Sequence, residues 1–254
     1  MILYRHPGLQ GLEIWQGLAQ HSTLYQLRDD RPAYFAGLSE FLARLHAGEA
    51  ETAGGDSLGA AAGFARLILT GGDAAAASPL IDWPHVVADA GPFAARRGAE
   101  AVWREFGWRR PSAIDLGQSR LKLITPGGGE CFERELPFGH AALEAETGRT
   151  RLRDWIRRAI PGGCDGVVLA LPVALSADGV AAPSTYPGLS GPVEPLFSSL
   201  FADVPWAVVN DAVLAARGYP PAFREKTLVL TLGFGVGAAI WHSHFSSAGR
   251  YEHL

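Results

Sequence analysis

The 254-residue chain has few cysteines, few lysines and no long apolar run. Its two cysteines, Cys131 and Cys164, are too few for a disulfide framework or for a zinc site with four protein ligands of familiar spacing. No run of about 18 apolar residues is present, which argues against a membrane span. The N-terminus also lacks the apolar core of a signal peptide. We therefore expect a cytoplasmic protein.

An excess of positive charge is also missing. Lys122 and Lys226 are the only lysines, and the formal net charge is -4. Proteins that bind nucleic acids usually carry a basic patch, so this balance gives no support to such a role. Hydrophobic residues make up 48% of the chain and charged residues 19%, as in a compact globular protein. We expect a small-molecule substrate and neither nucleic acid nor membrane as a partner; a homodimer stays open.

Apolar runs of five or six residues alternate with helix-like segments, which predicts an α/β fold. The long stretch 172–191 is rich in Pro, Gly and Ser and is expected to be a functional loop, and the end of the chain, 246–253, is polar. The expected strands are 66–70, 85–88, 113–116, 120–125, 166–171, 206–209, 227–232 and 237–241, and the expected helices lie within 8–48 and at 92–106, 151–160 and 212–218.

An acidic residue and a tight turn stand at the end of one apolar strand. Asp115 lies near Gly117 and Ser119, with Lys122 on the following strand. Backbone N–H groups of a glycine turn can approach phosphate oxygens, and a nearby carboxylate can hold Mg²⁺ through water. Lys122 would add a point charge near the phosphates. The alternative is an ordinary hairpin in which Asp115 caps its own turn.

Two more glycine turns follow apolar strands. Gly233, Gly235 and Gly237 occupy alternate positions between two strands, and Gly71 and Gly72 follow a third. Glycine leaves the backbone bare, which suits close contact with an anion or a nucleoside. Glycines also occur at bulges and at plain strand-to-helix turns that bind nothing. Both interpretations stay open from the pattern alone.

Asp211 follows an apolar strand and is placed like a general base. A carboxylate there can accept the proton of a substrate hydroxyl as a phosphoryl group arrives. The preceding Asn210 could orient it. The alternative is that Asp211 is the N-cap of a helix beginning at Ala212, since Asp is a favoured cap.

Together these segments resemble the sugar-kinase branch of the actin-like ATPase superfamily, and most closely its ROK family (repressors, open reading frames, kinases). Residues 114–122 are similar to the first phosphate motif, 208–218 to the segment with the catalytic Asp, and 230–240 to the second phosphate motif. Residues 182–189 and 249–253 are similar to the sugar-contacting loop and the sugar-binding element.

The order of the segments departs from that family. Residues 67–74 resemble its adenosine motif, with features of type III pantothenate kinases, and 92–99 resemble the helix that closes the fold. Both normally come last, and here both precede the first phosphate motif. We therefore expect a circular permutant of the two-lobed, ribonuclease H-like fold, which requires termini that lie close together. The expected lobes are 111–210 and 211–254 plus 1–90, connected by the closing helix at 91–110.

The resemblance implies ATP- and Mg²⁺-dependent phosphoryl transfer to a hydroxyl of a small metabolite, for which a hexose is the expected class. Asp211 is then the base and Asp115 holds the metal ion. The residues implied to contact ligands are Gly117, Ser119, Lys122, Gly233, Gly235 and Gly237 at the phosphates, Gly71 and Gly72 at the adenosine, and Asn210, Thr185 and Glu252 at the acceptor.

Three alternatives stay open. A pantothenate-type kinase performs the same reaction on another acceptor, and polyphosphate can replace ATP as the donor. A non-catalytic regulator that binds nucleotide or sugar is the third, because Phe234 stands where the second phosphate motif commonly has a threonine hydroxyl.

Overall fold

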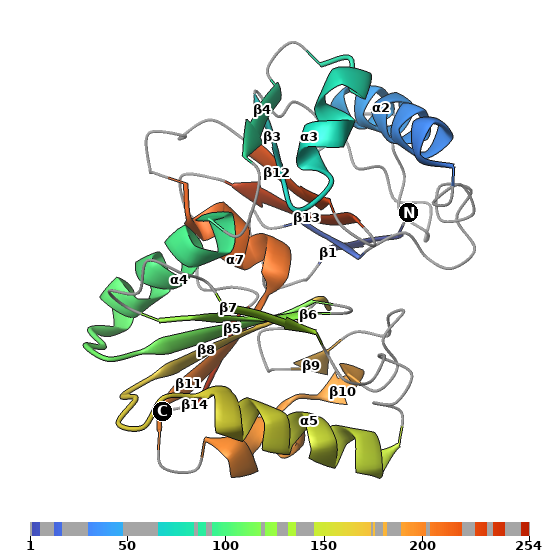
Figure 1. The fold of residues 1–254 in the computed structure, drawn as a ribbon. Helices are drawn as coiled ribbons and strands as arrows, with labels where there is room; N and C mark the ends of the chain where they lie inside the picture. Colours follow the sequence, from blue (N-terminus) through green and yellow to red (C-terminus); the bar gives the residue numbers. More distant parts are fainter. Residues whose placement is uncertain are drawn as a thin grey trace. The chain divides into compact units, whose positions relative to one another are not determined.

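Figure 1 shows a computed structural model of the chain. The α/β class predicted from the sequence is confirmed. The chain forms two compact units, unit 1 with Met1–Phe93 and Tyr219–Ser246, and unit 2 with Ala94–Gly218 and Ser247–Leu254. The residues that the structure describes are 2–5, 13–16, 30–47, 66–83, 86–89, 93–117, 120–125, 132–135, 145–173, 175, 180–181, 189–201, 204–219, 227–232, 236–241 and 250–253.

Unit 2 is built on a six-stranded sheet in the order β14-β11-β8-β5-β6-β7. Strands β5, β6 and β7 form an antiparallel meander, β8 runs parallel to β5, and β11 runs parallel to β8. Strand β14 pairs antiparallel with β11 at one edge. The strands are β5 (Ser112–Leu116), β6 (Arg120–Ile124), β7 (Phe132–Glu135), β8 (Val167–Leu171), β11 (Trp206–Asn210) and β14 (Arg250–His253).

Helices cover both faces of this sheet. Because both faces of its central strands are therefore buried, β8 consists of apolar residues only, and so does β11 apart from its last residue, Asn210. On one face, Leu152 and Ile156 of α5 pack with Ile114 of β5 in the hydrophobic core. Helices α4 and α7 lie on the other face (Figure 1). The bounds are α4 (Phe93–Phe106), α5 (Glu146–Ala159) and α7 (Asp211–Arg217), with short α6 (Glu194–Phe197), a 3₁₀ turn (Ser198–Leu200) and the strand pair β9 (Val180–Ala181) and β10 (Gly191–Pro192).

Unit 1 has its own six-stranded sheet, in the order β1-β2-β13-β12-β3-β4. Strand β12 is antiparallel to β13 and parallel to β3, and β4 is parallel to β3. Tyr34, Phe35, Leu38 and Leu42 of α2 are buried in its core. The elements are β1 (Ile2–Arg5), β2 (Glu13–Gln16), α2 (Arg31–Ala47), β3 (Arg66–Thr70), α3 (Ala74–Ala77), a 3₁₀ turn (Ser78–Leu80), β4 (Val86–Asp89), β12 (Thr227–Leu232) and β13 (Val236–Trp241).

The two sheets share one arrangement of five strands. In each, three antiparallel strands form a meander and two further strands run parallel to its first strand. The order is β7-β6-β5-β8-β11 in unit 2 and β2-β13-β12-β3-β4 in unit 1. Unit 2 follows the chain order. In unit 1, however, the parallel strands come from residues 66–89 and precede the hairpin strands at 227–241.

The structure differs from the sequence-based expectations at several places, of which three strands illustrate the reason. Residues 13–16, expected to be helical, form β2, and the polar end of the chain contributes β14. Strand β7 was not expected at all. All three are four-residue strands whose existence depends on a pairing partner, and two of those partners are distant in sequence, so local pattern carries little signal for them. The segment 211–254, which was expected to lie in one lobe with residues 1–90, is divided between the two units, since α7 and β14 belong to unit 2.

None of the helices in the described part of the chain has the length and apolar character that crossing a bilayer requires.

Candidate functional site

The parallel strands β5, β8 and β11 end at the same edge of the unit 2 sheet. Asp115 is the penultimate residue of β5, and Asp211 directly follows β11. Asp115 is level with Ala170 of β8, and Ala170 is level with Val209 of β11, so these three residues share a face. Asp211 lies two residues beyond Val209. Because open α/β sheets bind ligands beyond the carboxyl ends of their parallel strands, this edge is the candidate functional site.

Asp115 forms an ion pair across the hairpin. Lys122 is its register partner on β6, and the Lys122 Nζ lies 2.8 Å from the Asp115 Oδ2. The Asp115 side chain is only 10% exposed and that of Lys122 is 29% exposed. Charge-assisted hydrogen bonds of this length are strong, so the pair fixes the orientation of the Asp115 carboxylate.

Asn210, and not Asp211, is the N-cap of α7. The Asn210 Oδ1 accepts hydrogen bonds from the backbone N–H groups of Ala212 (3.0 Å) and Val213 (3.1 Å). Its Nδ2 donates to the Val173 carbonyl oxygen (3.0 Å), just beyond β8. This buried side chain therefore fixes the backbone from which Asp211 projects. The capping role considered for Asp211 belongs to its neighbour, while the expected contact of Asn210 with a substrate stays a prediction.

Asp211 is the first residue of α7, and its acidity is strongly altered. The Asp211 Oδ1 accepts a hydrogen bond of 2.7 Å from the Ala212 N–H. Burial raises the pKa of Asp211 to about 7, and the negative charge of Asp115 adds to the increase. The Ala212 N–H and the positive charge of Lys122 oppose it. A carboxylate with this pKa can both accept and release a proton near neutral pH, as a general base must.

The raised pKa predicts that Asp211→Asn stabilises the fold at alkaline pH. The native state binds the proton more tightly than the unfolded chain, so the free energy of unfolding falls as pH rises from about 4 to about 7. Asparagine removes the buried charge and keeps an acceptor for the Ala212 N–H. We expect a gain on the order of 2 kcal/mol at pH 8, since solvent screens part of the full shift for this partly exposed residue.

Urea denaturation at pH 5 and pH 8 measures this effect, and the gain at pH 5 should be less than half of that at pH 8. Asp154→Asn on the surface of α5 is the matched control, because that carboxylate is 51% exposed, and it should show no such gain. Equal gains at both pH values would show that the gain does not come from removing the ionised Asp211 carboxylate.

The carboxylates of Asp115 and Asp211 could supply only part of the coordination shell of a metal ion. Among the described residues, no group of three or more His, Cys, Asp or Glu side chains could hold one. Asp115 already has a cation at 2.8 Å. Mg²⁺ is usually bound by one or two carboxylates together with waters and substrate phosphates. Asp115 therefore fits a cation that brings phosphate and water ligands with it, and does not fit one held by protein ligands alone.

In unit 1, the Gly71–Gly72 turn packs against the end of β12. Gly71 has a φ of +97°, and a Cβ there would lie 2.2 Å from the carbonyl oxygen of Leu232. The same oxygen accepts a hydrogen bond from the Asp73 N–H (3.1 Å). Leu232 is followed directly by the predicted phosphate turn at 233–237. The Gly71–Gly72 turn thus contacts the residue that immediately precedes the predicted phosphate turn.

Gly71→Ala is expected to destabilise the protein by about 2 kcal/mol, because alanine at this positive φ is strained and its Cβ collides with backbone. Gly72→Ala is the matched control, since a Cβ there meets nothing within 4 Å. Thermal denaturation of both variants measures the difference. Equal melting temperatures would show that Gly71 has no structural role of its own.

The other predicted site residues stay predictions. Gly117 directly follows β5. Gly237 lies within β13 opposite Thr231, because this strand begins one residue earlier than expected. Glu252 lies in β14 opposite Ala207. Ser119, Thr185, Gly233 and Gly235 lie outside the described residues. So do Met1 and Leu254, and the expectation that these two termini lie close together therefore stays a prediction.

Sequence reasoning missed the residues that hold α7 in place. A Cβ on Gly98 of α4 would lie 1.8 Å from the Leu214 carbonyl oxygen of α7, so the two helices touch backbone to backbone. The Arg217 Nη1 lies 2.6 Å from the Glu105 Oε2 and joins the same helices. A glycine in the middle of a long helical pattern was the available signal, since such a glycine usually has a packing reason.

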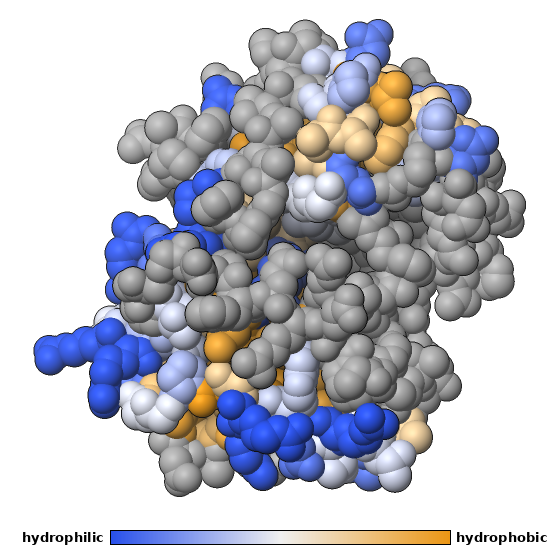
Figure 2. Space-filling model, in the orientation of Figure 1, coloured by the Kyte–Doolittle hydropathy of each residue, from blue (hydrophilic) through white to orange (hydrophobic). Residues whose placement is uncertain are grey.

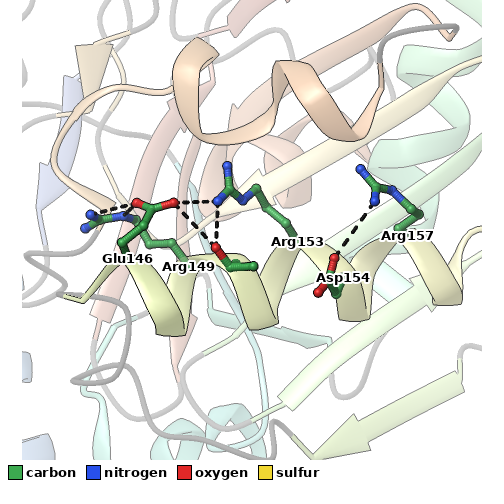
Figure 3. Close-up of polar contacts among 6 residues, drawn as sticks. Glu146, Arg149, Arg153, Asp154 and Arg157 are labelled. Carbon is green, nitrogen blue, oxygen red and sulfur yellow. Dashed lines mark hydrogen bonds and ion pairs between the residues drawn. The ribbon is translucent and has the colours of Figure 1, made fainter.

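The basic helix α5 lies apart from this site. Glu146 pairs with Arg149 and Arg153, and Asp154 pairs with Arg157, along the length of this helix (Figure 3). The Arg149 hydrogen bond holds the pKa of Glu146 below its usual value. Hydrophilic residues line one side of the helix in Figure 2. Exposed pairs of this kind contribute little to stability, and they lie on the sheet face opposite to Asp115.

Comparisons with known proteins do not identify a family for this chain. No protein-family model matches the chain, and no curated protein matches it. The solved structures that match include a glucokinase from Parabacteroides distasonis ATCC 8503, with 19% sequence identity and a TM-score of 0.36. The match covers 53% of this chain and 44% of the glucokinase chain, so less than half of that protein is represented. At this TM-score the similarity establishes neither a shared fold nor a shared function.

Proposed function

We propose that the chain is a circularly permuted kinase of the actin-like ATPase type, related to the ROK sugar kinases. It transfers the γ-phosphoryl group of ATP to a hydroxyl of a small metabolite, with a hexose as the expected acceptor. The observation that carries the proposal is Asp211, a partly exposed carboxylate with a pKa of about 7 at the carboxyl end of the parallel strands of unit 2.

The strand order gives independent support. The same five-strand arrangement, three antiparallel strands beside two parallel ones, occurs once in each unit, which supports the two-lobed fold that the resemblance implies. In unit 1 the parallel strands of 66–89 precede the hairpin of 227–241. That reversal is what a permuted chain would produce.

The chemistry follows from the residues of unit 2. Ionised Asp211 accepts the proton of the acceptor hydroxyl as its oxygen forms a bond to the γ-phosphorus. The bond between the γ-phosphorus and the bridging oxygen breaks, and ADP leaves with the electron pair. Asn210 holds the start of α7, which keeps the Asp211 carboxylate in position. Lys122 and backbone N–H groups near Gly117 would face the phosphates. Bound Mg²⁺, held through water at Asp115, would neutralise phosphate charge.

A panel of donors and acceptors tests the proposal. Purified protein is given ATP or polyphosphate with hexoses or pantothenate, and phosphorylated product is measured by phosphorus NMR. Phosphorylation of a hexose supports the proposal, and phosphorylation of pantothenate alone replaces the acceptor. Nucleotide binding without any product would indicate the regulator. Failure to bind nucleotide at millimolar concentration, with no product from polyphosphate either, would overturn the proposal.

A further inference from the structure

Lys122 is one of only two lysines in the chain, and its register partners on both neighbouring strands are acidic residues. On β6 it is the register partner of Asp115 on β5 and of Glu133 on β7. Its ammonium contacts the Asp115 carboxylate at 2.8 Å. Asp211 directly follows β11 at the same carboxyl edge of the sheet, where β5, β8 and β11 run parallel.

Carboxylates at a partly buried site require compensation by positive charge when they are ionised. Protein sites often obtain it from a metal ion, but the described residues offer no group that could cage one. A lysine ammonium is a compact point charge with three hydrogen-bond donors, and it can do the same work. A divalent ion approaching Asp115 would meet this ammonium and be repelled by it.

We propose that Lys122 is the resident cation of the Asp115–Asp211 site. While no phosphate-bearing ligand is bound, its ammonium neutralises Asp115 and excludes divalent metal ions. A metal ion then enters only together with phosphate groups, which attract the ammonium and supply further oxygen ligands. The inference concerns the site of the proposed function, but it does not depend on whether phosphoryl transfer occurs.

Binding of Mn²⁺ alone tests the inference. Free Mn²⁺ is measured by electron paramagnetic resonance at pH 8, without nucleotide or sugar, for the wild-type protein and three variants. Lys122→Met removes the charge and keeps an unbranched chain, and it should lower the Kd for Mn²⁺ at least about tenfold. Lys122→Arg keeps the charge and should stay within about twofold of wild type. Adding Asp115→Asn to Lys122→Met should abolish the gain.

Three results would overturn the inference. A folded Lys122→Met variant with unchanged affinity would do so, and so would a gain that survives the loss of Asp115. The wild-type protein gives a readout that holds even where Lys122→Met does not fold, since binding of Mn²⁺ alone below roughly 0.1 mM would show that the ammonium excludes nothing. Because no nucleotide is present, an absence of kinase turnover leaves these results unaffected.

Discussion

Asp211→Asn is expected to lower kcat for phosphoryl transfer by roughly 10²- to 10⁴-fold, the usual contribution of a positioned general base. The fold should be intact, because asparagine can accept the Ala212 N–H bond that Asp211 accepts now. Asn210 also continues to cap the helix. The wild-type rate should rise with pH and level off above about 7, since the base works only when ionised.

Steady-state kinetics between pH 5.5 and 9 measure both effects, with circular dichroism to verify the fold. Asp154→Asn on α5 is again the matched control and should leave kcat unchanged. An Asp211→Asn enzyme with full activity would show that another group accepts the proton. A wild-type rate that does not vary across pH 7 would contradict the same assignment.

Gly98→Ala is expected to destabilise the protein by about 3 kcal/mol, although alanine is the better helix former by up to about 1 kcal/mol. The added Cβ would lie 1.8 Å from a backbone oxygen of α7, so α4 and α7 must separate by more than about 1 Å. Asp211 is the first residue of α7 and would move with it. A displacement of this size at a reacting group can reduce kcat about 100-fold.

Urea denaturation and kinetics on one preparation measure the two effects together. Gly162→Ala is the matched control in unit 2, because a Cβ there meets nothing within 4 Å. This variant should change the free energy of unfolding by no more than about 0.5 kcal/mol, and it should leave kcat unchanged. A Gly98→Ala protein that is more stable than wild type would show that helix propensity dominates and that the two helices are not in backbone contact.

Much of the architecture is encoded locally and could be predicted. The strands 66–70 and 227–232 have the observed bounds, and the hairpin that carries Asp115 and Lys122 differs by a single residue at each end. Five apolar residues bounded by glycine, proline or a charge form a strong local signal. Strand β14 could not be predicted, because it exists only through pairing with the distant β11, and the four-residue β2 pairs with the equally unexpected β1 and with the distant β13.

In the candidate site, too, some features could be predicted from the sequence and others could not. The carboxylates could be found because each ends an apolar strand, and parallel strands bring their carboxyl ends to one edge. The sequence could not decide between Asn210 and Asp211 as the cap, because both residue types are favoured there. Only the structure shows that Asn210 is the cap of α7, which leaves Asp211 available as the proposed general base. Packing of Gly98 against Leu214 is a tertiary contact that no spacing in the sequence specifies.

The most direct test of the central claim is a crystal structure with Mn²⁺ and a non-hydrolysable ATP analogue. We predict that the γ-phosphate lies at the carboxyl edge of the unit 2 sheet, between Asp115 and Asp211, with the Lys122 ammonium turned toward a phosphate oxygen. A nucleotide bound elsewhere on the protein, with the Lys122–Asp115 pair undisturbed, would contradict the claim that this edge is a phosphoryl-transfer site.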